Sequence, residues 1–328
     1  MTATALKIER PQATAPWGTL GVKVLESTPP LALLQAAKLD WTVDKSKISF
    51  LGKEGGNGYL SQIDIPGKYA LVRSSDQKVM DIVSEVYQPV QNIEALNFFD
   101  EFCKAGQLKM DTVGSLGQGK FVFAIASMMD GFTLKNGSNT DTIEGHLLFS
   151  LPHKLNHSIN IGFTSIRPVC MNTLRLAIND MKNRFTMWHS QKWDPEAAKD
   201  VLGLGKGQLE HFKEVATLLS RTPYNEVDLM RFWKQVFPIT QQAANDDDTA
   251  PVGMSRRAAE AAALVETSPG ANFAPGTWWN ALNAVTYMTD HTMGRTADGR
   301  MKQAWFGSTA VLKDKALRLA TEYAVNAA

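Results

Sequence analysis

The segment "LKMDTVGSLGQGKFVFAIASMMDG", Leu108 to Gly131, carries the clearest structural signal in the sequence. Two runs of strand-forming residues flank a cluster of glycines, a pattern typical of two β-strands joined by a tight turn. Further along the chain, "IEGHLLFSL" and "HSINIGFTSIRPV" have the same character, and the second alternates Ile159, Ile161 and Phe163 with small or polar residues. These four runs predict a meandering antiparallel sheet.

Helical patterns bracket these strands. The segment "NIEALNFFDEFCKAG" begins at Asn92, a residue type that favours helix N-caps, and ends at Gly106, a type that favours helix C-termini. A second helix is expected from about Asn172, since Pro168 ends the last strand and apolar residues then recur at helical spacing. Its apolar stripe comprises Leu174, Ile178, Met181, Phe185 and Trp188, and the adjoining polar stripe comprises Arg175, Asn179, Lys182, Thr186 and His189.

Beyond Trp193 most of the chain shows helical periodicity, and "GLGKG", Gly203 to Gly207, is typical of a turn that ends a helix. The expected fold class is therefore α+β: an antiparallel β-meander sheet flanked by helices, with a mostly helical C-terminal part. Three regions are expected: a flexible N-terminal arm over residues 1–16, an α+β core over 17–193, and a helical region over 194–328 with a loop or linker at 238–253.

Composition narrows the classes of function. The 328 residues are 44% hydrophobic, which suits a globular protein, and the net charge of +1 leaves any affinity for nucleic acid to local clusters. The longest apolar runs reach about half of the roughly 20 residues that a membrane-spanning helix needs. Only Cys103 and Cys170 are present, and the N-terminus lacks the pattern of a signal peptide. We therefore expect a cytoplasmic protein with no membrane span.

The segment "GSLGQGK", Gly114 to Lys120, fits the spacing of a phosphate-binding loop. That chemistry requires a serine or threonine after the lysine and a helix whose N-terminus faces the phosphates. Here Phe121 follows and opens a predicted strand. A glycine hairpin turn is the better interpretation.

Other candidate catalytic groups also have simpler interpretations. His146, His153 and His157 lie in or near a predicted loop and lack the helical spacing of a zinc site, so we expect solvated histidines. Cys170 precedes a helix and would be a nucleophile only if a histidine converged on it, whereas burial in the core is the common state of cysteine. The acidic residues near the sheet form no recognisable metal-binding array. We therefore expect no enzyme activity, no metal and no cofactor.

Local basicity remains as a signal of binding. Between Thr164 and Lys192 the basic residues outnumber a single acid, Asp180, and between Thr292 and Arg318 they outnumber Asp298 and Asp314. Tryptophans and a phenylalanine lie among them, as in proteins that bind single strands, although any surface helix also shows a charged stripe. The candidate nucleic-acid-binding residues are Arg167, Arg175, Asn179, Lys182, Arg184, Lys192, Arg295, Arg300 and Lys302.

Several separate motifs resemble one protein family and follow its order along the chain. They are "YQPVQNIEALNFFDEF", "GSLGQGKFVFAIA", "RPVCMNTL", "GTWWNALNAVTYMTDH" and "WFGSTAVLKDKALRLA". Together they resemble the domain-of-unknown-function family numbered nine-three-two, the phage/plasmid-like proteins, over roughly Trp17 to Tyr323. The resemblance implies a gene of a mobile element. The expected order of helix, four-stranded meander and helix is also similar to the core of single-strand annealing proteins such as RecT, Erf and phage Bet.

The leading hypothesis is an ATP-independent protein that binds and anneals single-stranded DNA in phage or plasmid recombination or replication. It would act as a homo-oligomer, a ring or a filament, with a phage exonuclease or a host single-strand-binding protein as further partners. The alternative is a non-enzymatic, self-assembling structural or host-interaction protein, in which "TWWNALNAVTYM" would form the seam between subunits. An enzyme that uses "GSLGQGK" to bind nucleotide is the third hypothesis.

Overall fold

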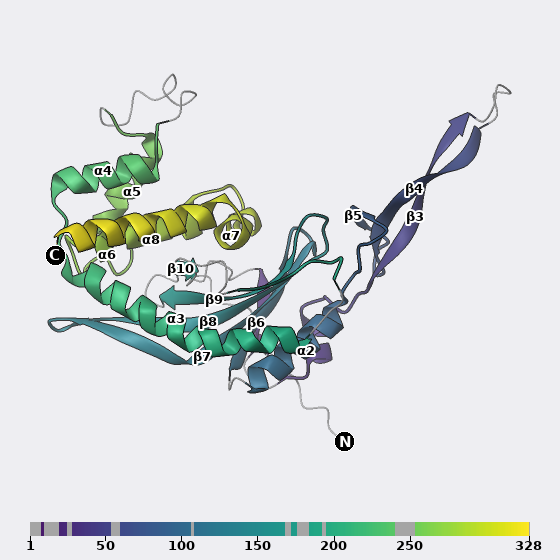
Figure 1. Ribbon diagram of the computed structural model, residues 1–328, viewed down its shortest axis with the longest axis horizontal. Coiled ribbons are helices and arrows are strands. Elements are labelled where there is room, and N and C mark those ends of the chain that lie inside the picture. Colours follow the sequence, from purple (N-terminus) through teal and green to yellow (C-terminus); the bar gives the residue numbers. More distant parts are fainter. Residues whose placement is uncertain are drawn as a thin grey trace.

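The computed structural model describes residues 8–9, 20–24, 28–53, 60–105, 108–167, 172–175, 184–191, 195–239 and 253–327. Figure 1 shows a body of sheet and helices from which a long two-stranded arm projects. The expected α+β class is confirmed: both sheets are antiparallel, and the C-terminal part is mostly helical. Among the described residues, no helix combines the length and the apolar character that crossing a bilayer requires.

The larger sheet contains the predicted meander. Its strands follow the order β1-β2-β6-β7-β8-β9, and β10 and β11 both pair with β9. The four strands expected from the sequence are β6 to β9, joined in succession by antiparallel pairing. The bounds are β1 Ile8–Glu9, β2 Gly21–Val24, β6 Lys109–Leu116, β7 Phe121–Asn136, β8 Asn139–Pro152, β9 Ile159–Arg167, β10 Asn172–Arg175 and β11 Arg184–Met187.

The apolar run at the start of β7 is buried on both faces of the sheet. Val122, Ala124 and Ala126 belong to the main core, which includes helix α2, Asn92–Ala105. Phe123, on the other face, packs edge-on against Trp305 of α7, Ala297–Phe306, with ring centroids 5.0 Å apart. A strand buried on both sides has no polar face, which explains why "FVFAIA" does not alternate.

Helix α2 begins where the sequence predicts, but Asn92 is not its N-cap. The main-chain N–H of Gln91 donates to the Glu94 carboxylate (3.0 Å), the bond that a glutamate at the third helical position makes to an N-cap residue. The Asn92 amide instead donates to the carbonyl oxygen of Leu39 at 2.8 Å. This bond joins α2 to the segment that follows helix α1, Pro30–Ala36.

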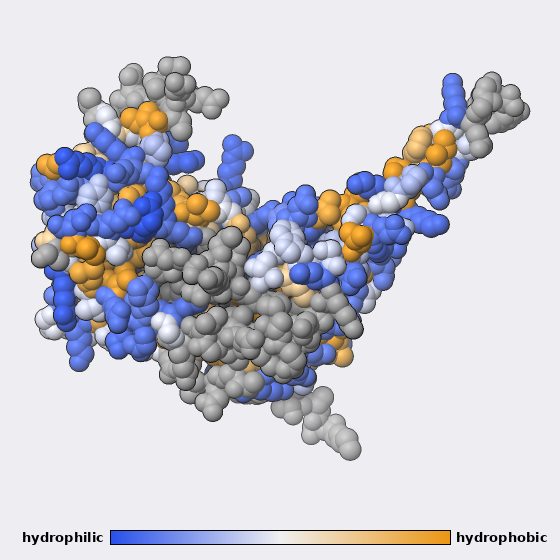
Figure 2. All heavy atoms as spheres, in the orientation of Figure 1, coloured by the Kyte–Doolittle hydropathy of each residue, from blue (hydrophilic) through white to orange (hydrophobic). Residues whose placement is uncertain are grey.

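A second sheet, β3-β4-β5, forms the projecting arm. Strands β3, Val43–Lys53, and β4, Leu60–Arg73, pair along most of their length, while β5, Val79–Ser84, pairs only with the part of β4 nearest the body. Phe50, Leu51 and Leu60 in the outer part are 52%, 71% and 64% exposed. Figure 2 shows apolar side chains along the arm among polar ones.

The helix predicted from Asn172 is wrong. Residues 172–175 and 184–187 are strands β10 and β11, which pair antiparallel with successive parts of the same edge of β9. An uncovered strand edge leaves main-chain groups unpaired, so pairing on this edge overrides the helical spacing of the apolar residues. The described residues of the segment do not follow the expected stripes: Trp188, placed in the buried stripe, is 50% exposed, whereas His189, placed in the polar stripe, is buried. Pro168 and Cys170 lie outside the described residues.

The helical region begins with α3, Pro195–Arg221, which lies across β7 and β9 (Figure 1). This helix continues through Gly203 to Gly207, so the prediction of a helix-terminating turn there is wrong. A helical lobe follows, consisting of α4 Glu226–Val236, α5 Arg256–Thr267, α6 Trp278–Tyr287, the π-helical turn η2 Met288–Thr292, α7, and α8 Ser308–Ala327.

The N-terminal arm and the loop that the sequence predicts are each described only in part. Within the expected N-terminal arm, Ile8 and Glu9 form β1 and pair with Val24 and Lys23 of β2. The other residues of that arm lie outside the described residues, as does most of the loop expected at 238–253. Pro238 and Ile239 follow α4 as irregular chain, and Gly253 forms a turn before α5 with a φ of 84°.

Helix α6 is the core of the helical lobe. All residues from Trp278 to Thr286 are buried within the single chain, and Trp278 stacks on Tyr323 of α8 with ring centroids 5.0 Å apart. The indole of Trp279 donates to the Asp141 carboxylate of β8 at 2.9 Å, which fixes the lobe to the β7–β8 hairpin. This segment therefore does not provide the subunit seam that the structural hypothesis assigned to it.

A buried ion pair crosses the same lobe. Lys313 of α8 donates to the Asp290 carboxylate of η2 at 2.8 Å, and the two side chains are 1% and 0% exposed. The π-helical turn continues α6 and carries Asp290 to this position. Each buried charge depends on the other, because an unpaired charge in the interior is costly.

We predict that Lys313→Met lowers the free energy of unfolding by about 3–5 kcal/mol, because it leaves the Asp290 carboxylate buried without its cation. Urea denaturation of the full chain measures the change. Lys213→Met provides the control, since Lys213 pairs with Glu210 on the exposed surface of α3 and such a pair contributes at most about 1 kcal/mol. Equal losses in the two variants would show that the buried pair is unimportant.

Candidate nucleic-acid interface

The β6–β7 turn is held by side chains from distant parts of the chain. Gln118, at the turn, has a φ of 60°, which is unusual outside glycine. Arg73 of β4 donates to its main-chain oxygen at 2.8 Å, and Lys78 donates to its side-chain oxygen. The main-chain N–H of Gly117 donates to the Asp298 carboxylate of α7 at 2.7 Å. The "GSLGQGK" segment is thus the hairpin turn predicted from sequence, and it joins the arm, the sheet and α7.

Three lysines converge beside this turn and are called the lysine triad below: Lys120, Lys154 and Lys302. Lys120 ends the turn, Lys154 lies in the β8–β9 loop, and Lys302 lies on α7; all three are half-buried. Partial burial lowers the pKa of Lys302, and the charges of Lys154 and Lys120 lower it further, against the opposing effect of Asp298. None of the three forms an ion pair with a described residue. Like charges held together in this way favour an anion.

Aromatic rings lie against the triad. The Lys302 ammonium is 4.6 Å from the ring centroid of Phe121, a cation–π contact. Phe121 also meets the His157 ring edge-on at 5.1 Å and stacks on Phe306 at 6.3 Å. Phe121 itself is buried, whereas His157 and Phe306 are half-buried. Two ring systems therefore reach the surface next to the lysines.

His153 fixes the loop that carries Lys154. Its Nε2 donates to the Asn92 side-chain oxygen of α2 at 2.8 Å, and its main-chain N–H donates to the carbonyl oxygen of Lys120 at 2.8 Å. The Trp41 ring packs edge-on against it at 5.2 Å. Complete burial lowers the pKa of His153 to about 3, with smaller effects from His189 and Arg73. The expectation of solvated histidines is wrong for His153 and also for His146, which is buried.

The second basic window of the sequence contributes one residue to the triad. Lys302 joins Lys120 and Lys154, which sequence reasoning had not selected. Arg300, on the same helix, donates to the carbonyl oxygen of Gly294 at 3.3 Å, and Arg295 is exposed in the loop before α7. Two other members of that window are not available for binding: Lys313 is in the buried ion pair, and Trp305 is buried under β7.

The first basic window follows the outer edge of β9. Arg167 is the last residue of β9, and Arg175 and Arg184 lie opposite Thr164 and Gly162 in the strand pairing. The two positions on β9 belong to one face of the sheet, about 7 Å apart along the strand. Asn179, Lys182 and Lys192 lie outside the described residues. This edge replaces the helical stripe that the sequence suggested.

A local signal for two members of the triad, Lys120 and Lys154, was present in the sequence. Lys120 directly follows the glycine turn, and Lys154 lies two residues after Pro152 in the loop between two predicted strands. Both lysines lie where a hairpin and a strand connection end, and such connections lie on the surface and often carry function. Their meeting with Lys302 depends on how α7 docks, and no local pattern contains that information.

Other candidate chemistries gain no support from the described residues. Among them, no three histidine, cysteine, aspartate or glutamate side chains are grouped so that they could hold a metal ion. Cys103 is a free, buried thiol, and burial together with the nearby Asp100 raises its pKa to about 12. It is therefore protonated at neutral pH and a poor nucleophile.

Comparison with known proteins identifies a family. Residues 79–305 match the sequence model of a domain of unknown function, DUF932, over more than half of the 328 residues. The chain belongs to the DUF932 family. Among curated proteins and among solved structures, nothing matches the chain. The resemblance to this family noted in the sequence is confirmed over residues 79–305, a shorter stretch than the Trp17 to Tyr323 expected.

The DUF932 match places the candidate interface within the family domain. All three triad lysines fall inside residues 79–305, as do the β9 edge and most of the helical lobe. Strands β3 and β4 precede the match, which begins with β5. Two of the three strands of the arm, β3 and β4, therefore lie outside the part of the chain that matches the DUF932 model.

We predict that protonation of His153 contributes to acid unfolding. Its pKa in the folded chain is about 3, against 6.5 in the unfolded chain, so only the unfolded state takes up this proton as the pH falls from 6.5 towards 3. Stability present above pH 6.5 is lost through that window, with a slope of up to about 1.4 kcal/mol per pH unit.

The measurement is urea denaturation of the parent and of His153→Gln from pH 7 to pH 4. The glutamine amide can still donate to Asn92 but does not titrate, so the stability of the variant should fall less steeply with pH. His211→Gln, at an exposed position of α3, is the control and should follow the parent curve. Parallel curves for the parent and His153→Gln would contradict the assignment.

Proposed function

We propose that this DUF932 protein binds single-stranded DNA and anneals complementary strands without ATP. It acts as a homo-oligomer in the cytoplasm of a bacterial host, in the recombination or replication of a phage or plasmid. The lysine triad carries the proposal, because three lysines from separate parts of the chain share one site and none of them forms an ion pair with a described residue, although Asp298 lies near enough to act on Lys302. Burial is the main cause of the lowered pKa of Lys302, and phosphates bound there would relieve the further lowering that Lys154 and Lys120 cause by repulsion.

The surroundings of the triad fit a single strand. Half-buried His157 and Phe306 offer ring faces and edges beside the lysines, and unpaired bases stack on such rings. Trp188, which is 50% exposed after β11, offers another ring near the Arg184 edge of β9. Binding and annealing require no bond chemistry, so the site needs only cations to neutralise phosphates and rings to support bases.

We predict that replacing all three triad lysines with glutamine weakens binding to a single-stranded oligonucleotide. Loss of three phosphate contacts should reduce the slope of log affinity against log salt concentration by about two, since each contact to a single strand contributes about 0.7. Fluorescence anisotropy with a labelled oligonucleotide at several salt concentrations measures both quantities.

The matched control is a second triple variant, Lys109→Gln, Lys135→Gln and Lys234→Gln. These lysines are exposed and lie away from the triad, and the variant has the same net charge. The control should bind like the parent. If both triple variants lose affinity equally, binding reflects overall charge, and if the triad variant binds like the parent, the interface is elsewhere.

The alternative function is a self-assembling structural or host-interaction protein, and the arm supports it. Leu51 and Leu60 are exposed on a two-stranded ribbon, and such a ribbon without cover is only marginally stable. Their register, Leu51 opposite Gln62 and Lys53 opposite Leu60, makes them diagonal neighbours on one face. This apolar face is the kind of surface that subunits bury on assembly.

We expect Leu51→Ser with Leu60→Ser to distinguish the two functions. Light scattering after gel filtration, with and without single-stranded DNA, gives the oligomer mass. Assembly that ignores DNA and disappears in the double variant would support the structural function. Assembly that depends on DNA, and on the triad lysines, supports annealing.

A further inference from the structure

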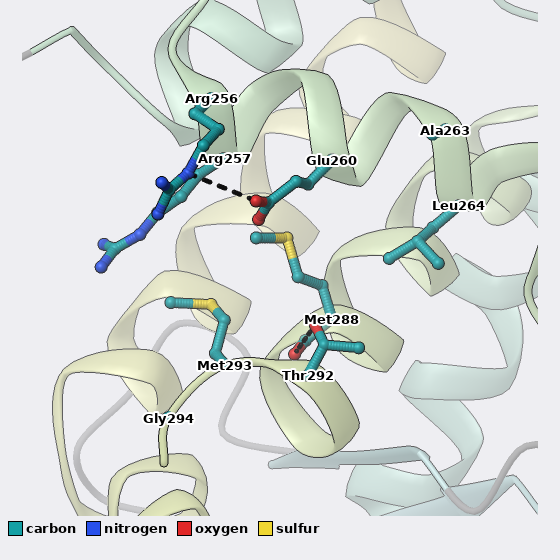
Figure 3. Close-up of a pocket in the computed structure, with 9 residues that line it drawn as sticks. All are labelled: Arg256, Arg257, Glu260, Ala263, Leu264, Met288, Thr292, Met293 and Gly294. Carbon is teal, nitrogen blue, oxygen red and sulfur yellow. Dashed lines mark hydrogen bonds and ion pairs between the residues drawn. The ribbon is translucent and has the colours of Figure 1, made fainter. Parts of the chain in front are cut away.

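A pocket of about 600 Å³ lies between α5 and the π-helical turn η2 (Figure 3). Leu264 of α5, Met288 of η2 and Met293 provide apolar walls, and Ala263 lies at the rim on α5. The volume is far larger than a single ion needs and falls in the range of pockets that bind small organic ligands. The apolar walls further indicate a ligand with an apolar body.

One side of the pocket carries two arginines. Arg256 and Arg257 are exposed at the start of α5, and Figure 3 shows both guanidinium groups on the side opposite Leu264. The first turn of α5 contains no acidic residue, so the arginines add to the positive end of the helix dipole. Arg256 pairs with Glu260 at 3.4 Å, whereas Arg257 forms no ion pair with a described residue.

Two polar groups lie between the cationic and apolar sides. The Thr292 hydroxyl donates to the carbonyl oxygen of Met288 at 3.0 Å, which leaves its oxygen able to accept a hydrogen bond. The carboxylate of Glu260 can also accept from a ligand N–H, and it keeps Arg256 oriented. A ligand here would meet cations at one end and hydrogen-bond acceptors along an apolar wall.

We propose that this pocket binds one nucleoside monophosphate unit. Arg256 and Arg257 would hold the phosphate, because the guanidinium fork matches phosphate oxygens in two-point contacts. The flat base would lie against the half-buried Met293, since thioether sulfur makes favourable contacts with aromatic rings. Glu260 and Thr292 would accept hydrogen bonds from amino or imino groups of the base.

The unit has two sources, a free nucleotide or a nucleotide of a bound strand, and the second source rests on the proposed function. The contacts of α7 favour a strand. Gly294 borders the pocket and accepts a hydrogen bond from Arg300, two residues before Lys302 of the triad. One helix therefore lies between the pocket and the triad, and Arg295 is exposed at its start.

The experiment records methyl spectra of the full chain with ¹³C-labelled methionine methyls, assigned by single methionine-to-leucine substitutions. Deoxyadenosine monophosphate should shift the Met288 and Met293 signals through the ring current of the base. Inorganic phosphate and deoxyadenosine are added separately as comparison ligands. Each should bind more weakly than the nucleotide, because each lacks half of the contacts.

Two variants test the pocket itself. Arg257→Gln should weaken nucleotide binding about tenfold, the effect of losing one charged hydrogen-bond partner. Ala263→Trp should abolish the shifts, because the indole would occupy the pocket from its exposed rim. Arg221→Gln, an exposed arginine at the end of α3, is the matched control and should bind like the parent.

The remaining outcomes distinguish a free nucleotide from a nucleotide of a bound strand, and failure of the pocket proposal from failure of the proposed annealing function. If an unlabelled oligonucleotide displaces the nucleotide, the pocket binds a nucleotide of a strand. If the nucleotide stays bound, the pocket binds a free nucleotide. Absent shifts, or equal shifts with phosphate alone, would overturn the pocket proposal even if the triad variant confirms strand binding. Conversely, shifts that persist in a chain with no affinity for oligonucleotides would sustain the pocket and reject the proposed annealing function.

Discussion

A strand that buries both of its faces needs cover on each, and β7 receives one cover from α2 and the other from α7. The packing of α7 also positions residues outside the core. When Trp305 packs on Phe123, α7 lies along the β6–β7 hairpin, Asp298 reaches the main chain of Gly117, and Lys302 comes to rest over the Phe121 ring. The lysine triad is thus a by-product of core packing, positioned by the same contacts that exclude water from the sheet.

This dependence explains which features the sequence could predict. The four-stranded meander, α2 and the helical C-terminal part follow from local patterns, because strand alternation, glycine turns and helical spacing each act over a few residues. The triad joins residues from three segments far apart in the chain, so no local pattern contains it. Lys302 was selected for its charged neighbourhood, and Lys120 and Lys154 were passed over as parts of a turn and a loop.

The errors have a common physical cause. The segment after Asn172 has helical spacing, yet β9 offers an unpaired edge, and main-chain pairing with it prevails. In "GLGKG" the glycines suggest a stop, yet α3 passes through them because a long helix packed on the sheet gains more than glycine costs. His153, between two predicted strands, becomes a buried link to Asn92. In each case tertiary contacts override a local preference.

The docking of α7 also has a consequence for the chain during its synthesis. The hydrogen bond between Gly117 and Asp298 spans 181 residues of the sequence. The face formed by Phe121, Phe123 and Ile125 is separated by a similar length of chain from α7, which covers it. At ribosomal rates of about 5–20 residues per second, this aromatic face emerges roughly 10–40 s before α7 does. Throughout that interval this aromatic face lacks its cover, so the sheet cannot be completed until the C-terminal helices have been translated.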